Sequence, residues 1–172
     1  MRKKLYLLTL KDFLKEISFK KPSPGGGSVS AFCSCMGVSL VEKILKYSSI
    51  DKVYLSSFNK AKKDLLLLLD KDAYYFEKKD YENACMVSDK IFDISFKMVK
   101  KIERLKPSLK KIFLPDIILS YSLLYTSCRN CLENIKVNIK LLKDKGSKNR
   151  WMKKKNILEK KLKLLDKRWL VS

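Results

Sequence analysis

Residues 22–31 read Pro22-Ser23-Pro24-Gly25-Gly26-Gly27-Ser28-Val29-Ser30-Ala31, and they are the most informative part of this sequence of 172 residues. The two prolines fix φ at the entry of the segment, whereas the three glycines permit positive φ and let another group approach the bare backbone. Apolar and small residues then recur at helical spacing up to Leu45. The segment predicts a loop that ends on a helix N-terminus, which favours an anion. A flexible hinge between two helices is the alternative interpretation.

The hydrophobic pattern on both sides of this segment predicts helices along the whole chain. Thr9, with Asp12 three residues later, predicts the start of a short first helix, whose apolar stripe comprises Leu10, Phe13, Leu14 and Ile17. Further helices are expected at about 28–47, 54–76, 81–105, 115–143 and 148–170, the last including Trp169. Gly146 and Ser147 are expected to end the helix at 115–143. Because no stretch alternates with period 2, we predict an all-α, single-domain bundle of about five or six helices over residues 1–172.

The composition is that of a globular protein. With 172 residues, of which 46% are hydrophobic, the chain can bury a core, and disorder is excluded. No apolar run approaches the roughly 20 residues that span a bilayer, and the N-terminal stretch lacks a cleavage signal. We therefore expect a cytoplasmic protein that does not contact a membrane.

The chain carries 39 basic and 18 acidic residues, which gives a net charge of +21. Such a charge raises the local concentration of polyanions, whether nucleic acid, an anionic membrane or a poly-acidic small ligand. The lysines are scattered and the aromatic residues lie at core spacing, unlike the basic clusters with exposed aromatics that bind nucleic acid. A nucleic-acid-binding protein is therefore the third and last of the functions considered.

The cysteines do not form a recognisable metal motif. Cys33 and Cys35 lie within one helical pattern, Cys128 and Cys131 lie within another, and the chain has no histidine. A zinc site would need a second set of paired ligands. We expect buried, reduced thiols and no metal site.

Without histidine, acid–base chemistry near neutral pH falls to carboxylates, lysine, cysteine or tyrosine. Asp72 lies three residues after Leu69 and four before Phe76, so it shares their side of the helix, whereas Asp70 faces elsewhere and should be more exposed. Apolar neighbours raise the pKa of a carboxyl group toward neutrality. Asp72 is therefore a candidate acid; a carboxylate paired with a nearby lysine is the alternative.

A second polar set is expected on the helix at 115–143. Asp116 lies in its first turn, where a carboxylate complements the helix dipole. Asn134 and Asn138 are four residues apart, share a face, and lie among apolar residues. A buried asparagine must find partners, so each predicts either a hydrogen bond between helices or a contact to a ligand.

Three blocks of this sequence resemble the cyclodeaminase/cyclohydrolase family of tetrahydrofolate enzymes, which comprises formiminotetrahydrofolate cyclodeaminase and methenyltetrahydrofolate cyclohydrolase. Residues 22–31 match the family's P-T/S-P-G-G-G-S-V-x-A pattern. Residues 69–76 match L-x-D-x-D-A-x-x-F, and Asp116 followed by residues 134–139 matches the late block that ends N-V-x-I/V-N-L/I. The resemblance covers roughly residues 10–145.

The resemblance implies an all-helical, homodimeric enzyme that needs no cofactor beyond its tetrahydrofolate substrate. It implies either closure of 5-formiminotetrahydrofolate to the 5,10-methenyl form with loss of ammonia, or hydrolysis of that form to 10-formyltetrahydrofolate. It makes Asp72 the catalytic acid. The residues that it places around the substrate are Pro24, Gly25, Gly26, Gly27, Ser28, Asp116, Asn134 and Asn138. The net positive charge additionally favours a polyglutamylated folate.

Two departures from the family pattern support a second hypothesis. Residues 110–115 lack the Gly-Asn pair that normally precedes the late block, and the segment 77–85 is shorter than usual. The alternative is thus a helical dimer that kept the fold and the glycine segment, as a folate-binding or structural protein, but lost turnover.

Overall fold

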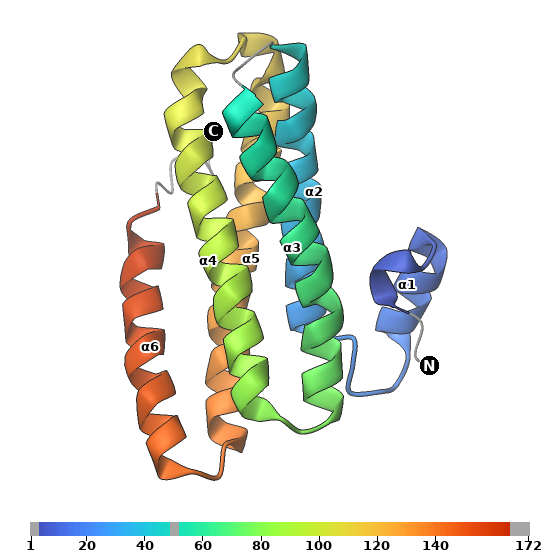
Figure 1. The fold of residues 1–172 in the computed structure, drawn as a ribbon, viewed down its shortest axis with the longest axis vertical. Helices are drawn as coiled ribbons and strands as arrows, with labels where there is room; N and C mark the ends of the chain where they lie inside the picture. Colours follow the sequence, from blue (N-terminus) through green and yellow to red (C-terminus); the bar gives the residue numbers. More distant parts are fainter. Residues whose placement is uncertain (1–3, 49–51, 166–172) are drawn as a thin grey trace.

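The computed structural model describes residues 4–48 and 52–165, and within them the chain is helical, with no strand. The helices follow one another in the order η1 (Leu5–Leu7), α1 (Leu10–Ser18), α2 (Gly26–Tyr47), α3 (Lys52–Glu77), α4 (Tyr81–Leu105), η2 (Lys106–Ser108), η3 (Lys111–Phe113), α5 (Leu114–Leu141) and α6 (Lys145–Lys163). The long helices α2 to α5 run side by side, while α1 and α6 lie on opposite sides of them (Figure 1). The expectation of an all-α bundle is confirmed.

The first helix begins as expected but packs differently. Thr9 is its N-cap, and the Thr9 hydroxyl oxygen accepts a hydrogen bond from the Asp12 N–H at 3.1 Å. Of the expected apolar stripe, Phe13 is buried, with its ring 5.1 Å from that of Phe32, whereas Leu10 and Leu14 are 61% and 55% exposed. The stripe does not face the core as a whole because α1 lies outside the bundle (Figure 1).

The last helix boundary was predicted wrongly. Gly146 and Ser147 do not end α5; they lie in the first turn of α6. Asp144 is the N-cap of α6, and its carboxylate accepts a hydrogen bond from the Ser147 N–H at 2.6 Å. This local hydrogen bond fixes the start of the helix at Asp144, although Gly146, two residues later, suggested a break. The expected extension to residue 170, with Trp169, lies outside the described residues.

The core lies between α2, α3, α4 and α5, where its largest fully buried side chains include Tyr121, Phe58 and Phe92. Helices α2 and α5 approach closely at Gly37, where a Cβ atom would lie 2.9 Å from the Ser120 carbonyl oxygen. All five cysteines are free, and four of them, Cys35, Cys85, Cys128 and Cys131, are buried as expected, whereas Cys33 is only partly buried. Among the described helices, α2 is the one that is long and apolar enough to cross a membrane, but 61% of the relevant window is buried in this bundle, as in a core helix.

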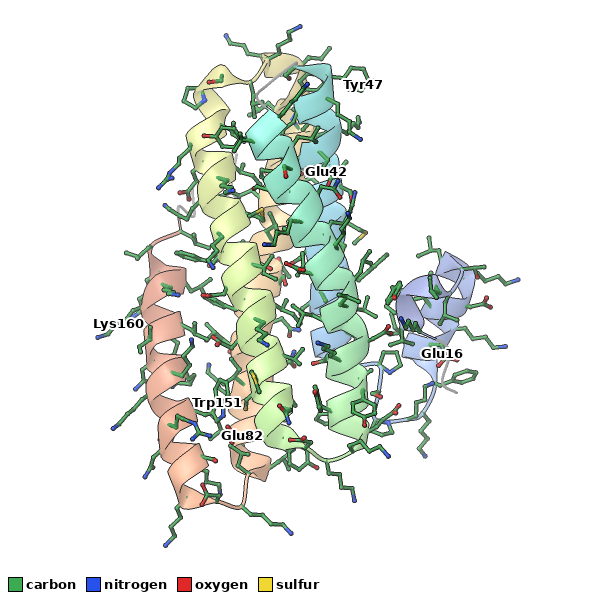
Figure 2. The ribbon with its side chains drawn as sticks, viewed as in Figure 1. Glu16, Glu42, Tyr47, Glu82, Trp151 and Lys160 are labelled. Carbon is green, nitrogen blue, oxygen red and sulfur yellow. The ribbon has the colours of Figure 1, made fainter. Side chains whose placement is uncertain are left out.

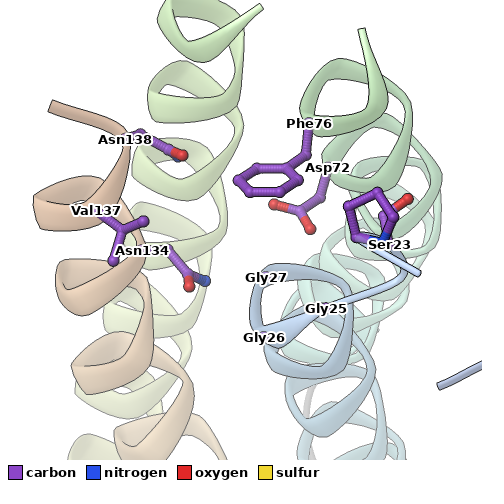
Figure 3. A pocket seen from close by; sticks show the side chains of 10 residues that line it. Ser23, Gly25, Gly26, Gly27, Asp72, Phe76, Asn134, Val137 and Asn138 are labelled. Atoms are coloured by element: carbon purple, nitrogen blue, oxygen red, sulfur yellow. The ribbon is translucent and has the colours of Figure 1, made fainter. Parts of the chain in front are cut away.

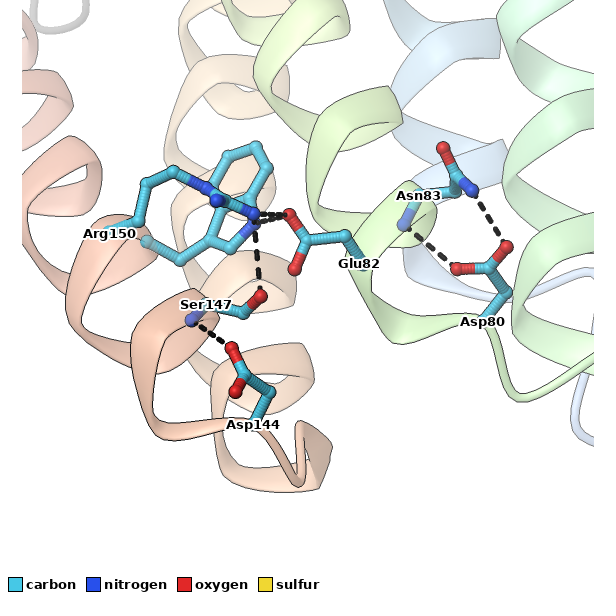
Figure 4. A network of polar contacts seen from close by, with 7 residues as sticks. Asp80, Glu82, Asn83, Asp144, Ser147 and Arg150 are labelled. Atoms are coloured by element: carbon cyan, nitrogen blue, oxygen red, sulfur yellow. Dashed lines mark hydrogen bonds and ion pairs between the residues drawn. The ribbon is translucent and has the colours of Figure 1, made fainter.

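Polar contacts attach α6 to α4. Glu82 of α4 accepts a hydrogen bond from the Trp151 indole N–H at 2.7 Å and pairs with Arg150 (Figures 2 and 4). Further along, ion pairs join Lys154 to Asp89 at 3.0 Å and Lys161 to Asp93 at 2.9 Å. Some of the basic residues of α6 therefore form ion pairs that hold this helix on the bundle.

Candidate active site

A cavity of about 130 Å³ opens at the end of the bundle where α2 begins and α5 ends. Side chains of α3 and α5 face each other across it, and the first turn of α2 forms its floor (Figure 3). It is lined by Pro22, Ser23, Gly25, Gly26, Gly27, Asp72, Phe76, Asn134, Val137 and Asn138. The structure therefore brings together the glycine segment, the candidate acid and the two asparagines.

The glycines serve close approach rather than unusual backbone conformation. No glycine in the described part of the chain has a positive φ, so that part of the expectation was wrong. Gly25 is the extended N-cap of α2, and Gly26 and Gly27 lie in its first turn, two residues earlier than the predicted start. At Gly27 a Cβ atom would lie 2.0 Å from Asp72 Oδ1. Only a residue without a side chain can occupy this position while the carboxyl group is present.

Asp72 is a buried acid. Its residue is 8% exposed, and the Ser28 hydroxyl donates a hydrogen bond to Asp72 Oδ2 at 3.1 Å. Burial raises the pKa of Asp72 from 3.8 to about 6, against the opposing effect of hydrogen bonds from the Ser28 hydroxyl and backbone N–H. No lysine among the described residues pairs with it, so the alternative of a lysine ion pair was wrong. A carboxyl group with this pKa can be present in either protonation state near neutral pH.

The neighbouring loop is held on α3 by other residues. Asp70 is more exposed than Asp72, as expected, and its carboxylate accepts a hydrogen bond from the Leu5 N–H at 2.6 Å. The Ser23 hydroxyl donates to Glu77 Oε1 at 2.6 Å and lies 3.2 Å from the Ala73 carbonyl oxygen. Pro24 and Ser28, which were expected near the substrate, are buried and do not line the cavity.

Two amides of α5 face the cavity, and one of them has a buried donor without a partner among the described residues. Asn138 is 3% exposed, and Asn134 Nδ2 is buried with no partner among the described residues. Both side chains point from α5 toward Asp72 and Phe76 (Figure 3). Because buried polar atoms are normally paired, the Asn134 amide is available to a ligand.

Asp116 does not line this cavity, contrary to expectation. It lies in the first turn of α5, roughly 30 Å along the helix from Asn138, at the other end of the bundle. Its carboxylate pairs there with Lys43 at 3.0 Å. The predicted helix at 115–143 already implied this distance, because the 22 residues between Asp116 and Asn138 span about 33 Å at about 1.5 Å per residue.

Sequence reasoning did not assign four lining residues to the site, although all four lie inside blocks that were recognised: Pro22, Ser23, Phe76 and Val137. It also missed Asn130, whose Nδ2 donates to the Gly26 carbonyl oxygen at 2.8 Å. The signal for Asn130 was present, since residues 130, 134 and 138 are spaced by four and share one face of a helix.

The raised pKa of Asp72 predicts how stability depends on pH. Because the folded pKa exceeds the unfolded one, the folded state binds this proton more tightly, and the resulting stabilisation is complete below about pH 4 and lost as the pH rises through about 6. Relative to Asp72→Asn, the wild-type free energy of unfolding should therefore fall by about 3 kcal/mol between pH 3 and pH 7. Urea unfolding of both proteins across this range measures the difference; a constant difference would contradict the raised pKa.

The protein is an all-helical bundle in which a buried carboxyl group packs against a glycine turn. The comparisons with known proteins agree with this helical fold. A family model described as formiminotransferase-cyclodeaminase matches residues 9–79, which contain the glycine segment and Asp72. The fold is similar to the crystal structure of formiminotetrahydrofolate cyclodeaminase from Thermotoga maritima, with a TM-score of 0.83, 19% identity and 91% of each chain covered. A comparison with curated proteins finds no match.

The family suggested by the sequence is supported over residues 9–79, and the fold that it implies is confirmed over most of the chain. The matched segment carries the signature, and the structural similarity extends the shared fold over most of the chain. The chain thus has the helical fold of the cyclodeaminase structure.

Proposed function

We propose that the protein acts on a tetrahydrofolate that carries a one-carbon unit, either hydrolysing the 5,10-methenyl form to the 10-formyl form or forming it from the 5-formimino form with release of ammonia. The observation that carries this proposal is the burial of Asp72 against the glycine turn, in a cavity lined by two asparagines, of which Asn134 has a buried amide nitrogen without a partner among the described residues. The Thermotoga maritima protein of the same fold is described as a formiminotetrahydrofolate cyclodeaminase.

Both reactions need a group that moves one proton at a folate nitrogen. In each, a tetrahedral carbon forms between N5 and N10, and a bond from that carbon to nitrogen then breaks. In the hydrolysis, water adds to the methenyl carbon and N5 leaves with a proton; in the closure, N10 adds to the formimino carbon and ammonia leaves. A carboxyl group with a pKa of about 6 can deliver or accept that proton near neutral pH.

The size and surroundings of the cavity suggest how a folate would lie. Its volume of about 130 Å³ is below the roughly 300 Å³ of a typical ligand pocket, so it would hold the reacting ring region while the remainder lies across the opening. Lys78 and Lys79 after α3, and Lys140 and Lys143 near the end of α5, are exposed at the same end of the bundle. These cations support the proposal of a polyglutamylated substrate.

The expected homodimer remains a proposal. A groove of about 560 Å³ with an almost wholly apolar lining runs along α2 and includes Met36, Leu119 and Leu123. A second copy that covers this groove would remove its apolar surface from water. Sedimentation of the full chain tests the proposal.

The alternative of a protein without turnover has one observation in its favour and one against it. The shortened segment after α3 lies beside Phe76 of the cavity, where a folate contact could have been lost. Residues 110–115, which lack the Gly-Asn pair, lie at the start of α5 and therefore at the other end of the bundle within one chain. The missing Gly-Asn pair therefore does not alter the cavity of this chain.

A spectrophotometric assay decides between these functions. The full chain is mixed separately with 5,10-methenyltetrahydrofolate and with 5-formiminotetrahydrofolate, and the methenyl absorbance is followed. A fall in the first mixture above the rate in buffer identifies a cyclohydrolase, and a rise in the second identifies a cyclodeaminase. Folate binding without either change would establish the alternative, and absence of both binding and turnover would refute a folate function.

A further inference from the structure

Asn130 connects the first turn of α2 to α5. Its Nδ2 lies 2.8 Å from the Gly26 carbonyl oxygen and 2.6 Å from Ser30 Oγ. The Ser30 hydroxyl in turn donates to the same Gly26 carbonyl oxygen at 2.7 Å. Asn130, Ser30 and Gly26 thus form a closed set of three hydrogen bonds at the point where α2 begins.

The turn held by this set separates the two walls of the cavity. On the α5 side, a Cβ atom at Gly26 would lie 3.2 Å from both Asn130 Nδ2 and Asn134 Oδ1. On the α3 side, the next residue, Gly27, is in contact with Asp72. A displacement of the turn toward either helix therefore changes the distance between Asp72 and the α5 amides.

The same set explains why Asn134 remains available. The Gly26 carbonyl oxygen and Ser30 Oγ are acceptors on α2 beside this stretch of α5, and both already receive a hydrogen bond from Asn130. Asn134 Nδ2, one helical turn along α5, is left buried and without a partner among the described residues. Asn130 itself does not line the cavity.

We propose that Asn130 is a positioning residue: by fixing the first turn of α2 on α5, it sets the place of Asp72 relative to Asn134 without touching the substrate. The proposal rests on the proposed function for its kinetic consequence, but its structural content concerns the surroundings of the Asp72 carboxyl group and holds for any ligand.

Ser127 provides a control, because its hydrogen bond also joins α5 to α2 but lies away from Asp72. Its hydroxyl donates to the Ser30 carbonyl oxygen at 2.9 Å, so it also joins α5 to α2, one turn farther from the cavity. Ser127 is buried and does not line the cavity. Loss of either bond should reduce stability, whereas loss of the Asn130 bonds alone should alter Asp72.

The test compares Asn130→Ala and Ser127→Ala in the full chain. The Asp72 carboxyl group is titrated by the pH dependence of its ¹³C chemical shift, a readout that needs no turnover. We expect Asn130→Ala to admit water to Asp72 and lower its midpoint by roughly one pH unit, and Ser127→Ala to leave it unchanged. With an active folate substrate, Asn130→Ala should lower kcat roughly tenfold and change KM less than about twofold.

An unchanged Asp72 midpoint in folded Asn130→Ala would overturn the proposal, as would an equal change in Ser127→Ala. If Asn130→Ala does not fold, Asn130→Leu is titrated instead, because its side chain is similar in size but has no N–H to donate to Gly26 or Ser30. It should lower the midpoint in the same direction, and no change would overturn the proposal. If the wild type turns over neither folate, the proposed function fails while the titration still decides the role of Asn130.

Discussion

Asp72→Asn is expected to lose at least about 100-fold in turnover of the folate substrate while it retains substrate affinity. The amide has the shape of the carboxyl group and can still accept the Ser28 hydrogen bond, but it has no proton to deliver or accept near neutral pH. Rapid mixing with excess enzyme measures the chemical step, and equilibrium binding measures the affinity.

Asp70→Asn is the matched control, because it is the same substitution two residues away on the other side of α3. Its amide oxygen can continue to accept the Leu5 N–H bond. Turnover by this variant should stay within about twofold of wild type. Wild-type turnover in Asp72→Asn, or equal losses in the two variants, would remove Asp72 from the reaction.

Gly27→Ala is expected to be the most damaging change in the glycine segment. The new Cβ atom would lie 2.0 Å from Asp72 Oδ1, so the carboxyl group or the first turn of α2 must move. Overpacking of this kind costs about 1–3 kcal/mol, which outweighs the gain of about 1 kcal/mol from replacing a helical glycine. Thermal unfolding should show a lower Tm, and turnover should fall about as far as in Asp72→Asn.

Two further variants test whether the loss of stability in Gly27→Ala comes from the contact with Asp72 or from any substitution in the glycine segment. At Gly25 a Cβ atom would have its nearest neighbour, the Pro22 carbonyl oxygen, at 3.7 Å, so Gly25→Ala should leave the Tm nearly unchanged. Gly27→Ala combined with Asp72→Ala removes the clash and should recover stability but not turnover. A double variant as unstable as Gly27→Ala would show that Asp72 is not what excludes a side chain at residue 27.

Helical periodicity predicted most of the fold because each long helix buries one stripe of its surface. The predicted range 81–105 coincides with α4, and the start of α1 at Thr9 follows from a local hydrogen bond. The side of α3 that carries Asp72 was predicted for the same reason, since its spacing from Leu69 and Phe76 places it with the buried residues.

The parts that could not be predicted depend on contacts between helices. Helical spacing assigns Asn130 and Asp116 to faces of α5 but not to the helix opposite, and so did not reveal that one fixes the glycine turn and the other pairs with Lys43. The purpose of the glycines was equally ambiguous, because positive φ and close approach require the same residue. Only the position of Asp72 distinguishes the two reasons.

The most direct test is the titration of Asp72 in the wild-type full chain, followed by ¹³C chemical shift and assigned with Asp72→Asn. A carboxyl group buried against the first turn of α2 should show a midpoint of about 6, raised from 3.8 by burial. A midpoint near 4 would mean that water reaches Asp72 freely, and it would contradict both the closed contact with Gly27 and a role for this residue as the acid.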